Sequence, residues 1–142
     1  MNNSHADLKQ FRQLQPDVGY QPKILIVEDE QIVAEDLQTT LQRLGYVVTG
    51  LSSSARDAIS KAGRTTPDLV LMDIHLNGDT DGVEAAEVIY WLYNIPVIYL
   101  TAFSNDPKFH RITRSNRFGY LAKPFEEQDL KSVIERALKT PK

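Results

Sequence analysis

Five polar residues that could act together each follow a short apolar run of this 142-residue sequence. They are Glu28 and Asp29 after the first run, Asp73 after the third, Thr101 after the fourth and Lys123 after the fifth. Neighbouring carboxylates repel one another unless a cation neutralises them. Oxygen ligands without His or Cys partners suit a hard ion, Mg²⁺, with Mn²⁺ as the alternative.

A hydroxyl and an ammonium group beside a metal held by carboxylates are typical of a site for a phosphoryl group. The metal and the lysine offset the charge of the phosphoryl oxygens, and the threonine donates a hydrogen bond. One carboxylate could itself be the nucleophile and become an acyl phosphate. The alternative is that each acid only caps a helix or ends a strand, an explanation that suits Asp29 alone better than all five residues together.

The elements that would position these residues are five apolar runs rich in Val, Ile, Leu and Tyr. Because the runs show almost no polar alternation, we expect strands that are covered on both faces. The expected strands are Ile24–Val27, Tyr46–Val48, Leu69–Met72, Ile95–Leu100 and Tyr120–Ala122.

Helix-like segments separate the runs. In the first segment Val33, Leu37, Leu41 and Leu44 recur at helical spacing, and Gly45 supplies a C-terminal stop. Capping pairs or acidic first turns indicate the other helix starts. They are Ser54 with Asp57, Asp81 with Glu84, Asp106 with Pro107, and the beginning of the last segment, Glu126 to Lys139.

Five strands alternating with five helices predict an α/β fold with a doubly wound parallel sheet and helices on both faces. Right-handed crossovers leave few topologies, and ligands of such folds sit beyond the carboxyl ends of the strands. The five polar residues would therefore meet at one edge of the sheet. Residues 1–21 are polar and show no sustained period, so we expect a tail or a single short helix before a domain of residues 22–142.

The composition excludes several classes of protein and site. No cysteine is present, which rules out disulfides and thiolate metal sites. A net charge of −3 argues against a nucleic-acid clamp, because such proteins carry a basic excess. The most apolar window, Val88–Leu100, is broken by Asn94 and Pro96 and is shorter than the roughly 20 residues of a membrane span. No secretion leader opens the chain, so we expect a cytoplasmic protein without membrane or direct nucleic-acid contact.

The expected third helix carries apolar residues on two faces. One stripe, which would cover the sheet, consists of Val83, Ala86, Ile89 and Tyr93. Off this stripe, where a surface helix should be polar, lie Val88, Trp91 and Leu92. Large exposed apolar groups indicate a contact surface, for a homodimer or another partner. Packing against the N-terminal tail or an unrecognised part of the core are the alternatives.

The motifs "ILIVEDE", "DLVLMDIHL", "DGVEAA", "PVIYLTA" and "GYLAKPF" occur in this order. The ordered set resembles the receiver domain of two-component response regulators, from Lys23 to about Lys139. The resemblance implies a flavodoxin-like fold with strand order 2-1-3-4-5. Because little sequence follows Lys139, we expect a single-domain regulator without an output domain.

The resemblance also implies a role for each acidic residue. Asp73 would accept a phosphoryl group, Asp29 would bind Mg²⁺ directly, and Glu28 would assist, through water. His75 would offer its backbone carbonyl to the metal. The loop after His75 is about one residue longer than the family's common pattern, which could shift the metal geometry there. Glu28 stands where Asp is commoner.

Three further residues would read out the phosphorylated state in this resemblance. Thr101 would donate a hydrogen bond to a phosphoryl oxygen, and Lys123 would form an ion pair with the phosphoryl group. Tyr120 occupies the aromatic switch position. The ring of Tyr120 would turn inward as Thr101 moves toward the phosphate. The Lys123–Pro124 bond is similar to the family's cis peptide.

The implied function is a signalling protein rather than an enzyme. A sensor histidine kinase or a phosphotransfer protein would supply the phosphoryl group, and a downstream protein would bind the switched face. Two alternatives remain, a receiver-like interaction module that never carries phosphate and a Mg²⁺-dependent aspartyl phosphatase. The module should have lost an acid, the Thr or the Lys, and the phosphatase usually has a second acid where this chain has His75.

Overall fold

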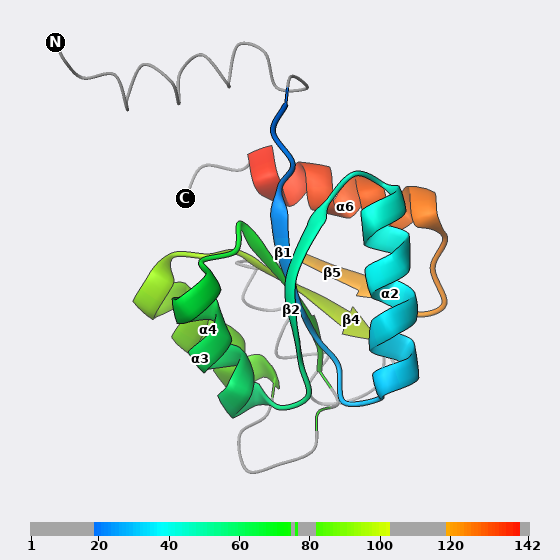
Figure 1. The fold of residues 1–142 in the computed structure, drawn as a ribbon. Coiled ribbons are helices and arrows are strands. Elements are labelled where there is room, and N and C mark those ends of the chain that lie inside the picture. The colour runs from blue at the N-terminus through cyan, green and yellow to red at the C-terminus, as the bar shows by residue number, and fades with distance from the viewer. Residues whose placement is uncertain (1–18, 75, 77–81, 103–118, 140–142) are drawn as a thin grey trace, which may run out of the picture.

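The computed structural model describes residues 19–74, 76, 82–102 and 119–139. Within them, a five-stranded sheet is flanked by four helices (Figure 1). The strands are β1 (Lys23–Val27), β2 (Val47–Ser52), β3 (Leu69–Asp73), β4 (Val97–Thr101) and β5 (Gly119–Ala122). The helices are α2 (Gln31–Arg43), α3 (Ala55–Thr65), α4 (Gly82–Tyr93) and α6 (Glu127–Lys139). The helix expected to begin at Asp106–Pro107 lies outside the described residues, as does Asp81.

All five strands run parallel in the order β2-β1-β3-β4-β5, which confirms the predicted flavodoxin-like topology. The register pairs Val27 with Met72, Asp73 with Leu100, and Thr101 with Ala122. Since the strands are parallel, their carboxyl ends form one edge of the sheet. The residues that end or follow β1, β3, β4 and β5 therefore lie along the same edge.

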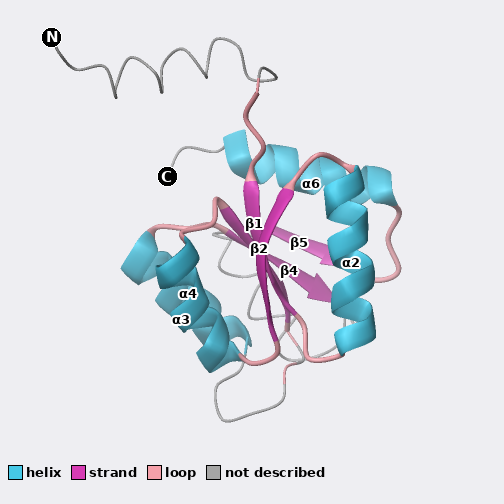
Figure 2. Cartoon of the chain, viewed as in Figure 1, coloured by secondary structure: helices cyan, strands magenta, loops and turns pink. Residues whose placement is uncertain are grey.

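Two separate cores explain why the strand sequences are apolar without interruption. Helices α3 and α4 cover one face of the sheet and α2 and α6 cover the other (Figure 2). Successive strand residues point to opposite faces, so neighbours in sequence belong to different cores. The core under α3 and α4 contains Leu25, Val27, Val70, Met72, Val97 and Tyr99. The core under α2 and α6 contains Ile24, Ile26, Leu69, Leu71, Ile98 and Leu100.

The helix ends follow local signals in the sequence. Helix α2 ends at Arg43 with Leu44 as its C-cap, and the following Gly45 has a φ of 99°, a left-handed conformation that suits glycine. Before α3, the Ser54 hydroxyl accepts a hydrogen bond from the backbone N–H of Asp57 at 3.1 Å, which confirms the predicted cap. Helix α6 begins one residue later than expected, at Glu127.

Strand β4 begins at Val97 rather than at Ile95, and three further local predictions differ from the structure. Val33 is 39% exposed, and Ala34 is buried in its place beside the predicted Leu37 and Leu41. Strand β2 continues to Ser52 although its apolar run ends at Val48, because pairing with β1 extends that far. Tyr93 was expected to cover the sheet but is 38% exposed. It leans over α3, where any side chain at Gly63 would collide with its hydroxyl.

Candidate functional site

The carboxyl-terminal edge of the sheet brings three acids together, as the sequence predicted. Glu28 and Asp29 directly follow β1, and Asp73 is the last residue of the neighbouring strand β3. One carboxylate oxygen of each residue lies within 4.8 Å of the corresponding oxygens of the other two. The side chains of Glu28 and Asp73 are 1% and 9% exposed, whereas Asp29 is half-buried. Such a cluster combines strong negative charge with little water.

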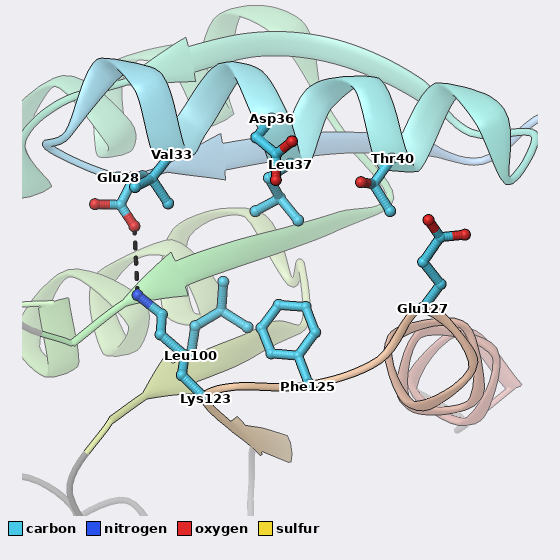
Figure 3. A pocket seen from close by; sticks show the side chains of 9 residues that line it. All are labelled: Glu28, Val33, Asp36, Leu37, Thr40, Leu100, Lys123, Phe125 and Glu127. Atoms are coloured by element: carbon cyan, nitrogen blue, oxygen red, sulfur yellow. Dashed lines mark ion pairs between the residues drawn. The ribbon is translucent and has the colours of Figure 1, made fainter.

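Lys123 supplies the positive charge at this edge. It follows β5, and its Nζ lies 3.5 Å from Glu28 Oε1 and 3.6 Å from Asp73 Oδ2 (Figure 3 shows the Glu28 pair). The backbone N–H of Lys123 donates a hydrogen bond to the Thr101 carbonyl at 2.7 Å, so the ends of β4 and β5 are joined directly. The Lys123–Pro124 peptide bond is cis. One cation therefore faces two of the three acids.

Thr101 and Tyr120 occupy different positions relative to this cluster. Thr101 ends β4 on the same edge as Asp73 and is 1% exposed. Tyr120 lies within β5, opposite Tyr99, and is 45% exposed. His75, the expected source of a backbone carbonyl for the metal, lies outside the described residues.

The environment of Glu28 is unusual for a carboxylate. Burial raises the pKa of Glu28 to about 7. A hydrogen bond from the Glu30 backbone N–H at 3.1 Å and the charge of Lys123 lower this pKa, whereas the charge of Asp73 raises it. Glu28 Oε1 is buried and accepts no hydrogen bond from the described residues. A buried oxygen that has the Lys123 ammonium at 3.5 Å but accepts no hydrogen bond from the described residues, next to two more carboxylates, fits a hard divalent cation. Glu28, Asp29 and Asp73 could therefore hold Mg²⁺.

The raised pKa of Glu28 predicts a pH-dependent stability in metal-free protein. Between its ordinary pKa of 4.5 and the folded value of about 7, the folded state holds a proton that the unfolded state has lost. The free energy of unfolding therefore falls as the pH rises through this interval. Because glutamine carries no charge, we expect Glu28→Gln to raise the free energy of unfolding by roughly 2–3 kcal/mol at pH 8 and by little at pH 5.

Urea unfolding in a chelating buffer at the two pH values measures this difference. Glu35→Gln is the matched control, because Glu35 is exposed on α2 and no pH-dependent gain is expected. A gain for Glu28→Gln that is equal at both pH values would contradict the prediction.

A cavity of about 280 Å³ adjoins the acidic cluster between α2 and the connection from β5 to α6 (Figure 3). Glu28 and Lys123 line its inner end, and an ion pair of Arg43 with Glu127 joins α2 to α6 nearby. The remaining lining residues are Val33, Asp36, Leu37, Thr40, Leu100, Phe125 and Glu127. The sequence reasoning missed this cavity. The apolar Phe125, directly after Pro124 at the end of a motif, was the available signal.

Comparisons with known proteins agree with this architecture. The family model described as response regulator receiver domain matches residues 24–135. The transcriptional regulatory protein PdtaR of Mycobacterium tuberculosis is 34% identical over 122 residues, covering 86% of this chain and 59% of PdtaR. The phyllosphere-induced regulator PhyR of Methylorubrum extorquens is 30% identical over 140 residues, covering 94% of this chain and 52% of PhyR. The chain thus spans little more than half the length of these curated relatives.

A solved structure extends the comparison to the site. The receiver domain of the sensor histidine kinase PA1611 from Pseudomonas aeruginosa PAO1 is 31% identical and superposes with a TM-score of 0.75. The match covers 85% of this chain and 100% of that domain. That structure holds a magnesium ion in its active-site cleft. Among the residues described in the present structure, no helix has the length and hydropathy needed to cross a membrane.

Proposed function

Since this chain belongs to the response regulator receiver domain family, we propose that Asp73 accepts a phosphoryl group and that the product changes the affinity for a protein partner. Residues 22–142 form the receiver domain in this proposal, and residues 1–21 precede it. The observation that carries the proposal is the cluster of Glu28, Asp29 and Asp73 with Lys123 facing it.

The position of Asp73 supports its role as the acceptor. It ends β3, between β1 with its two acids and β4 with Thr101. An Asp73 oxygen would attack the phosphorus of a phosphohistidine. The P–N bond breaks as the O–P bond forms, and the imidazole nitrogen leaves with the electron pair. The Lys123 ammonium, 3.6 Å from Asp73 Oδ2, would then pair with a phosphoryl oxygen.

The acids at the edge of the sheet support a role for Mg²⁺. Glu28, Asp29 and Asp73 would hold the ion, with the His75 carbonyl as a further ligand. Bound Mg²⁺ would offset the negative charge of the phosphoryl oxygens. This donor set contains only oxygen atoms, as Mg²⁺ prefers and as Mn²⁺ also accepts.

Thr101 and Tyr120 would couple phosphorylation of Asp73 to a change at the protein surface. Thr101 would donate its hydroxyl to the phosphoryl group, and Tyr120 would turn toward the space that Thr101 leaves. The exposure of Tyr120, 45%, supports this role because the ring has surface to lose on turning inward. Phosphorylation would shift an existing balance between two arrangements. A histidine kinase or phosphotransfer protein would donate the phosphoryl group to this chain, and a downstream protein would bind the switched face. Both would act in the cytoplasm.

Incubation with acetyl phosphate and Mg²⁺, followed by intact-mass measurement, tests the proposal. We expect the wild-type chain to gain one phosphoryl group, Asp73→Asn to gain none, and a chelator to prevent the gain. Asp129→Asn is the matched control, because Asp129 is an exposed aspartate on α6 that belongs neither to the acidic cluster nor to the lining of the adjoining cavity and should leave the gain intact. A wild-type chain that stays unmodified would favour the interaction module, and rapid steady release of phosphate would favour the phosphatase.

A further inference from the structure

We propose that Gly82 is a positioning residue for Asp73, because only a residue without a side chain leaves room for the end of the acceptor strand. Gly82 is the first residue of α4, and Asp73 is the last residue of β3. The inference deepens the proposed function and rests on the role of Asp73 given there. It concerns the place of Asp73 in the folded protein and assigns Gly82 no contact with substrate.

Gly82 packs directly against the main chain of Asp73. It is buried, and a β-carbon added to it would lie 2.8 Å from the Asp73 carbonyl oxygen. The next nearest atoms would be Ile74 Cα and Met72 Sδ, both at 3.3 Å. A carbon and an oxygen at 2.8 Å are inside their contact distance, so α4 or β3 would have to move.

The requirement at Gly82 is for space rather than for an unusual backbone conformation. Among the described glycines a positive φ occurs at Gly19 and Gly45 and not at Gly82, so alanine could adopt the same backbone angles. Glycine is also a poorer helix former than alanine. The close approach of α4 to β3 therefore accounts for glycine at this position.

The packing around Asp73 leaves the end of β3 few ways to yield. Its neighbours Met72 and Ile74 are fully buried. Asp73 pairs with Leu100 of β4, and the Ile74 N–H donates a hydrogen bond to the Leu100 carbonyl at 3.3 Å. Because close-packed interiors transmit strain, a methyl group at position 82 would displace the peptide of Asp73.

A displaced peptide would carry the Asp73 carboxylate with it. Asp73 Oδ2 lies 3.6 Å from Lys123 Nζ, and one Asp73 oxygen lies within 4.8 Å of oxygens of Glu28 and Asp29. These distances determine whether the acids can share one cation and whether Asp73 can reach the phosphorus atom of a donor. A misplacement of about 1 Å can cost on the order of a hundredfold in rate. Gly82 would thus act on the reaction through the position of Asp73.

Gly82→Ala in the full-length protein tests the inference. We expect it to bind Mg²⁺ at least about tenfold more weakly than wild type. At saturating Mg²⁺ we expect it to gain a phosphoryl group from acetyl phosphate at least about tenfold more slowly. Isothermal titration measures the affinity, and intact mass at successive times measures the rate. Urea unfolding gives the folded fraction, and trimethylamine N-oxide, which favours folded states, is added to all proteins if the variant is partly unfolded.

Gly63→Ala and Gly50→Ala are the matched controls. A β-carbon at Gly63 would collide with the Tyr93 side chain, so this change disturbs the packing of α3 on α4 without pressing on the Asp73 backbone. A β-carbon at Gly50 would have its nearest neighbours at 3.7 Å, an ordinary contact. We expect both controls to keep the Mg²⁺ affinity and the phosphorylation rate of wild type.

Weaker Mg²⁺ binding and slower phosphorylation in folded Gly82→Ala, with both controls unchanged, is the supporting result. A Gly82→Ala protein equal to wild type would overturn the inference, as would an equal loss in Gly63→Ala. A Gly82→Ala chain that stays unfolded with the osmolyte would also overturn it, because the glycine would then serve the fold as a whole. A wild-type chain that gains no phosphoryl group would instead count against the proposed function itself.

Discussion

Replacing Asp29 with Asn is expected to weaken Mg²⁺ binding by about a hundredfold or more. The asparagine keeps one oxygen ligand but loses the negative charge that a divalent ion requires. Lys123 already offsets part of the charge of Glu28 and Asp73, at 3.5 and 3.6 Å. The half-buried Asp29 would therefore contribute a large share of the attraction for an incoming cation.

Isothermal titration of Mg²⁺ into the full-length protein measures this loss. Glu30→Gln is the matched control, because Glu30 is the next residue, is exposed and makes the same change in net charge. Its side chain is not part of the acidic cluster, so we expect an affinity close to that of wild type. If Glu30→Gln weakened binding as much as Asp29→Asn, the effect would come from overall charge and the assignment of Asp29 as a ligand would be wrong.

Ile98→Ala is expected to lower the free energy of unfolding by about 2–5 kcal/mol. Ile98 is fully buried in β4, where it pairs with Leu71 on one side and Gly119 on the other. Its side chain belongs to the core under α2 and α6, so truncation leaves a cavity within that core. A small domain is stable by roughly 5–15 kcal/mol, so this loss is a large part of the total.

Ile32→Ala makes the same chemical change at a surface position and serves as the control. Ile32 is 81% exposed on α2, and we expect a change within about 0.5 kcal/mol. Urea unfolding followed by circular dichroism measures both variants, and equal slopes with denaturant show that the unfolded states are comparable. A loss for Ile32→Ala as large as that for Ile98→Ala would show that Ile32 is covered in solution.

The parallel sheet and the edge that carries the acids could be predicted from the apolar runs, whereas the strand order was implied by the resemblance of the ordered motifs to receiver domains. The runs of β1, β3 and β4 are buried on both faces, and a polar residue after such a run lies at the strand's end. Individual helix faces were harder to predict. Ala34 rather than Val33 is buried on α2, because small rotations of a helix decide which of two adjacent apolar residues meets the sheet. Tyr93 leans over Gly63, a contact between helices that the sequence pattern does not contain.

The chemical environment of the site depended on three-dimensional contacts. Glu28 was predicted as a metal ligand, but no sequence pattern indicated that burial raises its pKa to about 7. That value depends on the depth of the side chain, on the Glu30 N–H and on the charges of Asp73 and Lys123, which come from separate segments. The cavity beside Lys123 likewise depends on the separation of α2 from α6, which no local signal in the sequence specifies.

Alternate strand residues belong to two different cores, and this packing determines which parts of the site can change in evolution. A shift of any central strand by one residue would move its apolar side chains to the opposite face of the sheet. Packing in the two cores therefore fixes the register of each strand and the position of its last residue. The two cores thus determine the positions of the acids at the ends of β1 and β3, and the acids contribute little to the packing of these cores. Evolution could therefore exchange the acids, or retune their ionisation, on a scaffold that keeps its shape.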